Sequence, residues 1–277
     1  MISDKKIHDI FYSLEKNPEL FSYKFRGFSL YFVLRFNIEM SIRRYEYQAE
    51  TYEHPSLLKM QYRDLRFLLT NKKKQFESRK FIKEFDSLKD IKVSPFLFLS
   101  TSENANGQEL KEVINFYQEN RIPVNFIQGN YNTKPFRLSQ HEIFLSFSPF
   151  NTKKINSEEK KELSNFIKFL NKNLEFDFSK ELYSWRVHLG LMKYRVKIIE
   201  EYIKKVNAKY LFSRSLYTEP WAIMACCNAG IKCVEVQHGV LTEHSIYYQT
   251  TVKKEDLGKH TLLFPHFILT LGEEWTK

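Results

Sequence analysis

The sequence has no uninterrupted apolar stretch of about 20 residues, the length that a membrane-spanning helix requires. Its opening residues, Met1-Ile2-Ser3-Asp4-Lys5-Lys6, also lack the apolar core of a secretory signal peptide. We therefore expect a cytoplasmic protein that is either free or held peripherally on the inner face of the membrane.

Glycine and proline are scarce, with eight of each among 277 residues, whereas phenylalanine (25) and tyrosine (16) are abundant. The hydrophobic fraction of 43% is too high for a disordered chain. This composition favours a helix-rich α/β protein over a turn-rich β-sandwich.

Several motifs of well-known enzyme classes are missing. The chain contains neither a G-x-G-x-x-G nor a Walker phosphate loop, and it has no G-x-S-x-G nucleophile elbow. Its three cysteines, Cys226, Cys227 and Cys233, do not have the spacing of a zinc site, so no metal is expected. We expect these cysteines to be reduced and buried.

The formal charge of +10 favours an anionic partner. The run Lys72-Lys73-Lys74 fits either a solvated face or a patch that contacts an anionic membrane surface. No nucleic-acid recognition motif accompanies the charge, so nucleic acid is not an expected partner.

Residues 1–90 are predicted to form a helical amino-terminal segment that packs on the following domain. Apolar periodicity predicts helices over residues 7–14 and 27–45. The second helix is apolar on nearly all sides and contains Arg35, which could pair with a buried carboxylate or contact a substrate or phosphate.

The α/β part begins near residue 93. Short apolar runs predict strands over residues 95–100, 123–127, 142–147, 210–212, 231–236 and 266–271. Amphipathic patterns predict helices over residues 109–120, 157–173 and 179–206.

A βαβ unit over residues 209–248 is the centre of the prediction. Its first strand leads into Ser213-Arg214-Ser215, its helix runs from Glu219 with Thr218 as N-cap to a stop at Gly230, and its second strand leads into Gln237-His238-Gly239. Parallel strands bind ligands beyond their carboxyl ends, where both polar clusters fall.

His238 is the leading catalytic candidate, as a general base, with a structural histidine as the alternative. Arg214 suits an anion contact because a guanidinium grips phosphate or carboxylate with two hydrogen bonds. Glu243 could orient His238 or His244, or could simply lie exposed in its loop. Glu235 could serve only as a salt-bridge partner.

Some of these residues resemble bacterial capsule and surface-polysaccharide glycosyltransferases of GT-B architecture. The similar residues are 234–240 with their Gln-His-Gly motif, His244, Tyr247-Tyr248, residues 265–275, residues 23–30 and Arg35.

The resemblance implies that residues 91–277 form a Rossmann-like parallel sheet flanked by helices, the acceptor-side half of a GT-B enzyme. It implies His238 as the base, together with Gly239. The shared position at adjacent strand ends leads us to expect Arg214, Gln237 and Gly239 to line the cleft, and Glu243 and His244 complete the candidate substrate-binding residues. The expected reaction moves a sugar from a nucleotide-sugar donor to a surface or capsular glycan without a cofactor.

The same resemblance places a carboxy-terminal nucleotide-sugar domain after the Gly-Glu-x-Trp region, where this chain ends. The expected partners therefore include a second domain or subunit that completes the cleft. The alternative function is a non-catalytic glycan-binding or scaffold subunit of a membrane-associated polysaccharide assembly machine.

Overall fold

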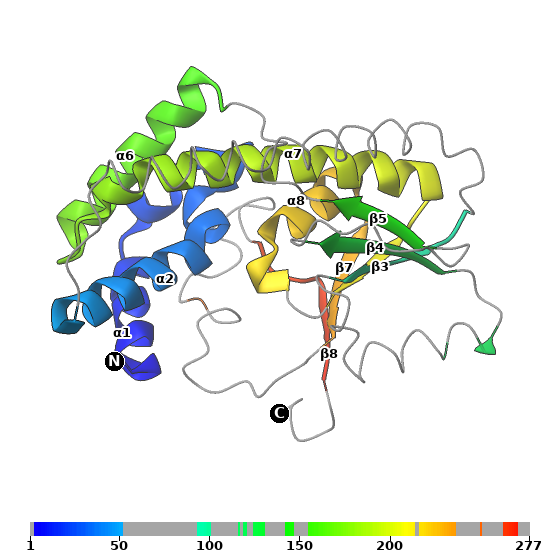
Figure 1. Cartoon of the computed structure of the whole chain (residues 1–277), viewed down its shortest axis with the longest axis horizontal. Helices are drawn as coiled ribbons and strands as arrows, with labels where there is room; N and C mark the ends of the chain where they lie inside the picture. Colours follow the sequence, from blue (N-terminus) through cyan, green and yellow to red (C-terminus); the bar gives the residue numbers. More distant parts are fainter. Residues whose placement is uncertain are drawn as a thin grey trace.

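A computed structural model describes residues 3–51, 93–100, 116, 119–120, 124–130, 142–146, 155–213, 216–236, 250 and 263–270. These residues form an α/β fold in which helices flank a parallel sheet (Figure 1). The expected fold class is confirmed at this level. In the described part of the chain, no helix is both long and apolar enough to cross a membrane.

The amino-terminal elements are α1 (Asp4–Glu15), η1 (Pro18–Phe21), the hairpin β1 (Lys24–Phe25) and β2 (Phe28–Ser29), and α2 (Leu30–Thr51). The prediction that a helix starts at Gly27 was wrong. Arg26 and Gly27 have φ angles of 53° and 87°, which make the tight turn of the hairpin, and the helix begins only after it.

The next helices are α6 (Ser157–Asn173), η2 (Phe178–Glu181) and α7 (Leu182–Val206). Asn156 and Glu159 form a reciprocal capping box at the start of α6, over two hydrogen bonds of 2.7 Å. Glu159 also binds Lys193 of α7 at 2.9 Å, which ties the two helices together. Figure 1 shows α7 running from the group of α1, α2 and α6 to the sheet.

The sheet has six strands within the described residues, all parallel. They are β3 (Phe96–Ser100), β4 (Val124–Asn130), β5 (Glu142–Ser146), β6 (Tyr210–Ser213), β7 (Lys232–Val236) and β8 (Phe267–Leu269). Their spatial order is β5-β4-β3-β6-β7-β8, so the direction of strand addition reverses between β3 and β6. All six strands were predicted from apolar runs.

Helix α8 (Pro220–Ala229) connects β6 to β7 after the short η3 (Leu216–Thr218). The N-cap is Glu219, one residue later than the predicted Thr218, because Pro220 occupies the first helical position, where a missing N–H costs nothing. Gly230 ends the helix in the left-handed conformation with φ 69°, as predicted.

One continuous core holds the helices and the sheet together. Trp185 of α7, Phe25 of the hairpin, Leu97 of β3 and Trp221 of α8 are all at most 1% exposed and belong to the same cluster. Phe32 of α2 also packs edge-on against Phe264 at a ring-centroid distance of 5.6 Å. The described residues before and after the predicted boundary at residue 90 thus share apolar packing.

Candidate functional site at the carboxyl edge of the sheet

The predicted βαβ unit is confirmed by the pairing of β6 with β7. Phe212 pairs with Val234 and Ser213 pairs with Glu235 in a parallel ladder. Strand β3 lies on the other side of β6, so Ser100, Ser213 and Val236 end at one edge of the sheet. This edge includes the point where the strand order reverses, and ligands of open parallel sheets bind at such points.

The predicted site residues themselves lie outside the described residues. These are Arg214, Gln237, His238, Gly239, Glu243 and His244. Their neighbours in the chain are described: Arg214 follows Ser213, the last residue of β6, and Gln237 follows Val236, the last residue of β7. The roles assigned to the six residues stay predictions.

Glu219 is a buried carboxylic acid at this edge that the sequence analysis did not select. It is 1% exposed and forms the N-cap of α8 without a capping hydrogen bond from its side chain. Its Oε2 accepts a hydrogen bond from Ser213 Oγ at 3.1 Å, whereas its Oε1 is buried and has no hydrogen-bond partner among the described residues.

Burial raises the pKa of Glu219 to about 8, and the neighbouring carboxyl group of Glu235 acts in the same direction. The hydrogen bond from Ser213 and the charge of Arg195 favour the ionised form but do not offset the desolvation. Glu219 is therefore mostly a neutral acid at pH 7, with one oxygen able to donate a hydrogen bond.

Glu235 of β7 binds Leu216, the first described residue after β6. Its side chain is fully buried, and its Oε2 accepts the backbone N–H of Leu216 at 3.1 Å. Ser213, the last residue of β6, is thus bound by Glu219, and Leu216, the first residue of η3, is bound by Glu235. Sequence reasoning considered Glu235 only as a salt-bridge partner, but the structure gives it a backbone hydrogen bond.

Arg195 of α7 lies behind the edge, 6% exposed, with its guanidinium carbon 5.5 Å from the centroid of the Trp221 ring. His188 lies about two turns earlier on α7, and its Nε2 is buried. Burial, together with repulsion from Arg195, lowers the pKa of His188 to about 4. The histidine is therefore neutral at pH 7, and Arg195 is the one positively charged group among the causes that shift the pKa of Glu219.

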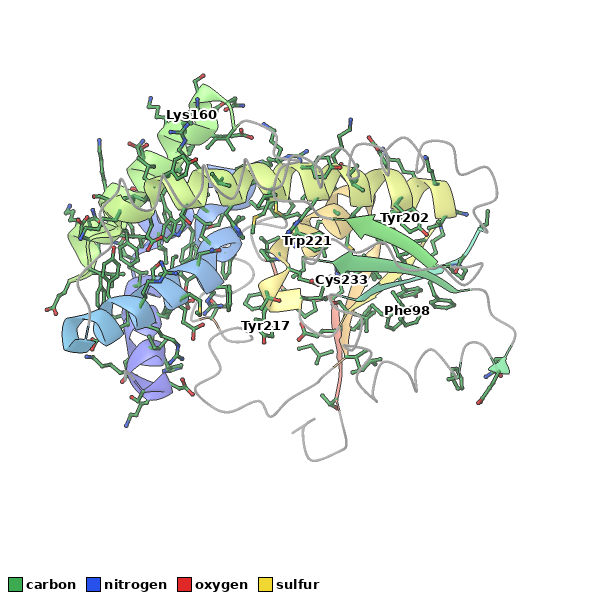
Figure 2. The ribbon with its side chains drawn as sticks, in the orientation of Figure 1. Phe98, Lys160, Tyr202, Tyr217, Trp221 and Cys233 are labelled. Carbon is green, nitrogen blue, oxygen red and sulfur yellow. The ribbon has the colours of Figure 1, made fainter. Side chains whose placement is uncertain are left out.

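Tyr217 is influenced by acidic groups both at the edge and on helix α2. It lies next to α8 on the side of the sheet that meets the amino-terminal helices (Figure 2). Burial, then the charges of Glu235 and of Glu39 on α2, raise the pKa of its phenol. Helix α2 therefore contributes an acidic group to the surroundings of this edge.

The amino-terminal helices also hold the chain that follows the Gln-His-Gly motif. Glu15 at the end of α1 accepts hydrogen bonds from Tyr31 Oη at 2.5 Å, Arg35 Nη2 at 2.9 Å and Thr250 Oγ1 at 3.0 Å. The guanidinium of Arg35 also lies over the rings of Phe11, Tyr31 and Phe32. Of the two readings of Arg35, the pair with a buried carboxylate is confirmed.

The cysteines lie at the opposite, amino-terminal edge of β7. All three are free thiols as expected, although Cys227 is only half-buried. Cys233 Sγ is 3.1 Å from Nδ1 of His266. A hydrogen bond from Cys226, then the contact with His266, lower the pKa of Cys233 to about 5 despite burial. Within the described residues, no three His, Cys, Asp or Glu side chains gather as a metal ion would need.

Comparisons of the chain with protein-family models, with curated proteins and with solved structures gave no match. The functional conclusion therefore depends on the edge described above and on the residues that follow its strands.

Proposed function

We propose that the protein is a glycosyltransferase that moves a sugar from a nucleotide-sugar donor to a hydroxyl of a bacterial surface or capsular glycan. The observation that supports this most is the adjacency of β6 and β7. The parallel neighbours β6 and β7 end at the same edge, next to the reversal of strand order, and in the sequence Arg214 and Gln237-His238-Gly239 follow directly after these two strand ends.

The order of the sheet agrees with a Rossmann-like domain. Numbered along the chain, its strands lie in the order 3-2-1-4-5-6, which is typical of doubly wound nucleotide-binding sheets. GT-B transferases use two such domains facing across a cleft, so we propose that a second lobe, from the same or another chain, completes this one.

In the proposed reaction His238 acts as the general base. It takes the proton of the acceptor hydroxyl while the oxygen attacks the anomeric carbon and the bond to the leaving nucleotide phosphate breaks. Arg214 binds the anionic leaving group, and Gln237, Gly239, Glu243 and His244 contact the sugars. Glu15 of α1 binds Thr250, which follows these residues in the sequence.

We further propose that the reaction takes place at the inner face of the membrane. Its formal charge of +10 would attract the protein to an anionic lipid surface. In this proposal the glycan acceptor is assembled at the same surface.

The direct test is to incubate the full-length protein with a panel of uridine, guanosine and cytidine nucleotide sugars and surface glycan as acceptor. Release of nucleotide that depends on the acceptor, together with growth of the glycan, is the expected result. Glycan binding without transfer for any donor would instead identify the non-catalytic, scaffold function.

A further inference from the structure

The Oε1 atom of Glu219 is the feature of the edge that the proposed reaction leaves unexplained. It belongs to a residue that is 1% exposed, and within the described part of the chain it has no hydrogen-bond partner, whereas Oε2 is held by Ser213. A buried polar atom without a partner costs about 1–3 kcal/mol, so native proteins rarely keep one without a reason.

Helix capping does not account for this carboxyl group. A residue at the N-cap normally uses its side-chain oxygen to accept a backbone N–H of the first turn, and Glu219 makes no such bond. Glu181, the N-cap of α7, also makes no capping bond, but its carboxylate lies 3.3 Å from Arg44. Glu219 thus differs from Glu181 in having a buried carboxyl oxygen that binds none of the described residues.

We propose that Glu219 is a ligand-binding residue whose Oε1 hydrogen-bonds a hydroxyl group of the carbohydrate acceptor at the carboxyl end of β6. This inference rests on the proposed function and adds to it the residue and the class of ligand. The place is suitable because β6 borders the reversal of strand order, where ligands of parallel sheets bind.

The charges around Glu219 favour a neutral hydroxyl over an anion. Glu235 of β7 is close enough to shift the pKa of Glu219, and Glu235 itself acts with Glu39 of α2 on Tyr217. Arg195 of α7 has the opposite effect on the pKa of Glu219, and its guanidinium lies over the ring of Trp221. A phosphate would meet repulsion from the carboxyl groups, whereas a sugar hydroxyl both donates and accepts a hydrogen bond.

A neutral carboxylic acid matches such a hydroxyl, because it offers one O–H donor as well as acceptor lone pairs. Ionisation removes the donor. Since the pKa of Glu219 is about 8, binding that uses this donor should weaken as the pH rises through that value.

The experiment measures binding of methyl β-D-glucopyranoside, methyl β-D-galactopyranoside and methyl N-acetyl-β-D-glucosaminide to the full-length protein by saturation-transfer NMR. At least one glycoside should bind the wild type at about pH 6 and bind about tenfold more weakly at about pH 9, where the acid is ionised. Glu219→Gln, which keeps a donor that cannot ionise, should bind at both values with little change. Glu219→Ala should lose about tenfold in affinity at both, a typical loss for one hydrogen bond in a buried site.

Glu181→Gln is the matched control and should bind as the wild type does. Equal binding by Glu219→Ala and the wild type, or no glycoside binding by the wild type at about pH 6, would overturn the inference. Binding of inorganic phosphate that requires Glu219 would overturn the class of ligand. If Glu219→Ala does not fold, the flat pH profile of Glu219→Gln decides the question instead.

Failure of this inference can be told from failure of the proposed function. Glycoside binding needs no nucleotide-sugar donor and no transfer, so it is measured independently of the reaction. Transfer activity with normal glycoside affinity in Glu219→Ala would remove Glu219 alone, whereas Glu219-dependent binding without any transfer would remove only the transferase reaction.

Discussion

Thr250 Oγ1 donates a hydrogen bond of 3.0 Å to Glu15 Oε2, across a separation of 235 residues in the chain. Thr250 follows the Gln-His-Gly motif by a dozen residues, and Glu15 ends the first helix. The amino-terminal helices therefore do more than pack beside the sheet, because Glu15 at the end of α1 also binds Thr250 in the carboxy-terminal part of the chain.

Glu15→Gln should destabilise the protein strongly. The substitution removes the negative charge opposite Arg35, which is 6% exposed, and a buried charge left without its partner costs about 3–5 kcal/mol. Urea unfolding should show this loss in the free energy of unfolding. Glu46→Gln is the control, since its partner Lys6 is on the surface and such pairs contribute about 1 kcal/mol or less. Equal effects of the two substitutions would contradict the importance of the Glu15 network.

Glu219 should make the stability of the protein fall with rising pH. The folded state keeps the proton of Glu219 up to about pH 8, whereas the unfolded chain releases it near the ordinary value of 4.5. Between these values the folded state binds the extra proton, so raising the pH favours unfolding by up to about 1.4 kcal/mol per pH unit.

Glu219→Gln should remove this contribution, because the amide does not ionise. Unfolding midpoints of the wild type and the variant, measured from about pH 5 to about pH 8, should diverge steadily in favour of the variant. Parallel curves over this range would show that Glu219 is already ionised in the folded protein.

Gly230→Ala should cost about 1–2 kcal/mol of stability, the penalty for a left-handed residue with a Cβ atom. The φ angle of Gly230 is 69°, and a Cβ atom added there would meet nothing within 4 Å, so the whole effect is conformational. Gly230→Asn should lose less, because asparagine tolerates this conformation, as Asn207 does at the end of α7. Thermal unfolding compares the two variants, and a larger loss for asparagine would contradict the argument.

The sequence alone was sufficient for most of the fold because strands and helices here carry clear periodic patterns. Short apolar runs located all six strands, and α6 was predicted with both of its ends. Local turn chemistry caused the errors: the hairpin at Arg26 and Gly27 delayed α2, and Pro220 moved the start of α8 by one residue. Both depend on backbone angles that apolar periodicity does not encode.

The site was harder to predict because acidic residues are normally read as surface residues. Glu15, Glu219 and Glu235 are buried only because distant segments cover them, and their partners lie on other elements. The position of Glu219 just before Pro220, four residues after the strand-end polar cluster that ends at Ser215, was the one signal in the sequence that could have identified it. Only the pairing of β6 with β7 shows that Glu219 lies near Glu235.

The central claim is the proposal that His238, which follows the end of β7 by two residues in the sequence, is the base of a sugar-transfer reaction. The most direct test is the kcat of acceptor-dependent transfer by His238→Ala in the full-length protein, with the partially exposed His8→Ala as control. We predict a decrease in kcat of about 10²–10⁴-fold with an unchanged circular dichroism spectrum, the usual effect of removing a general base. A kcat within a few-fold of the wild type would contradict the account.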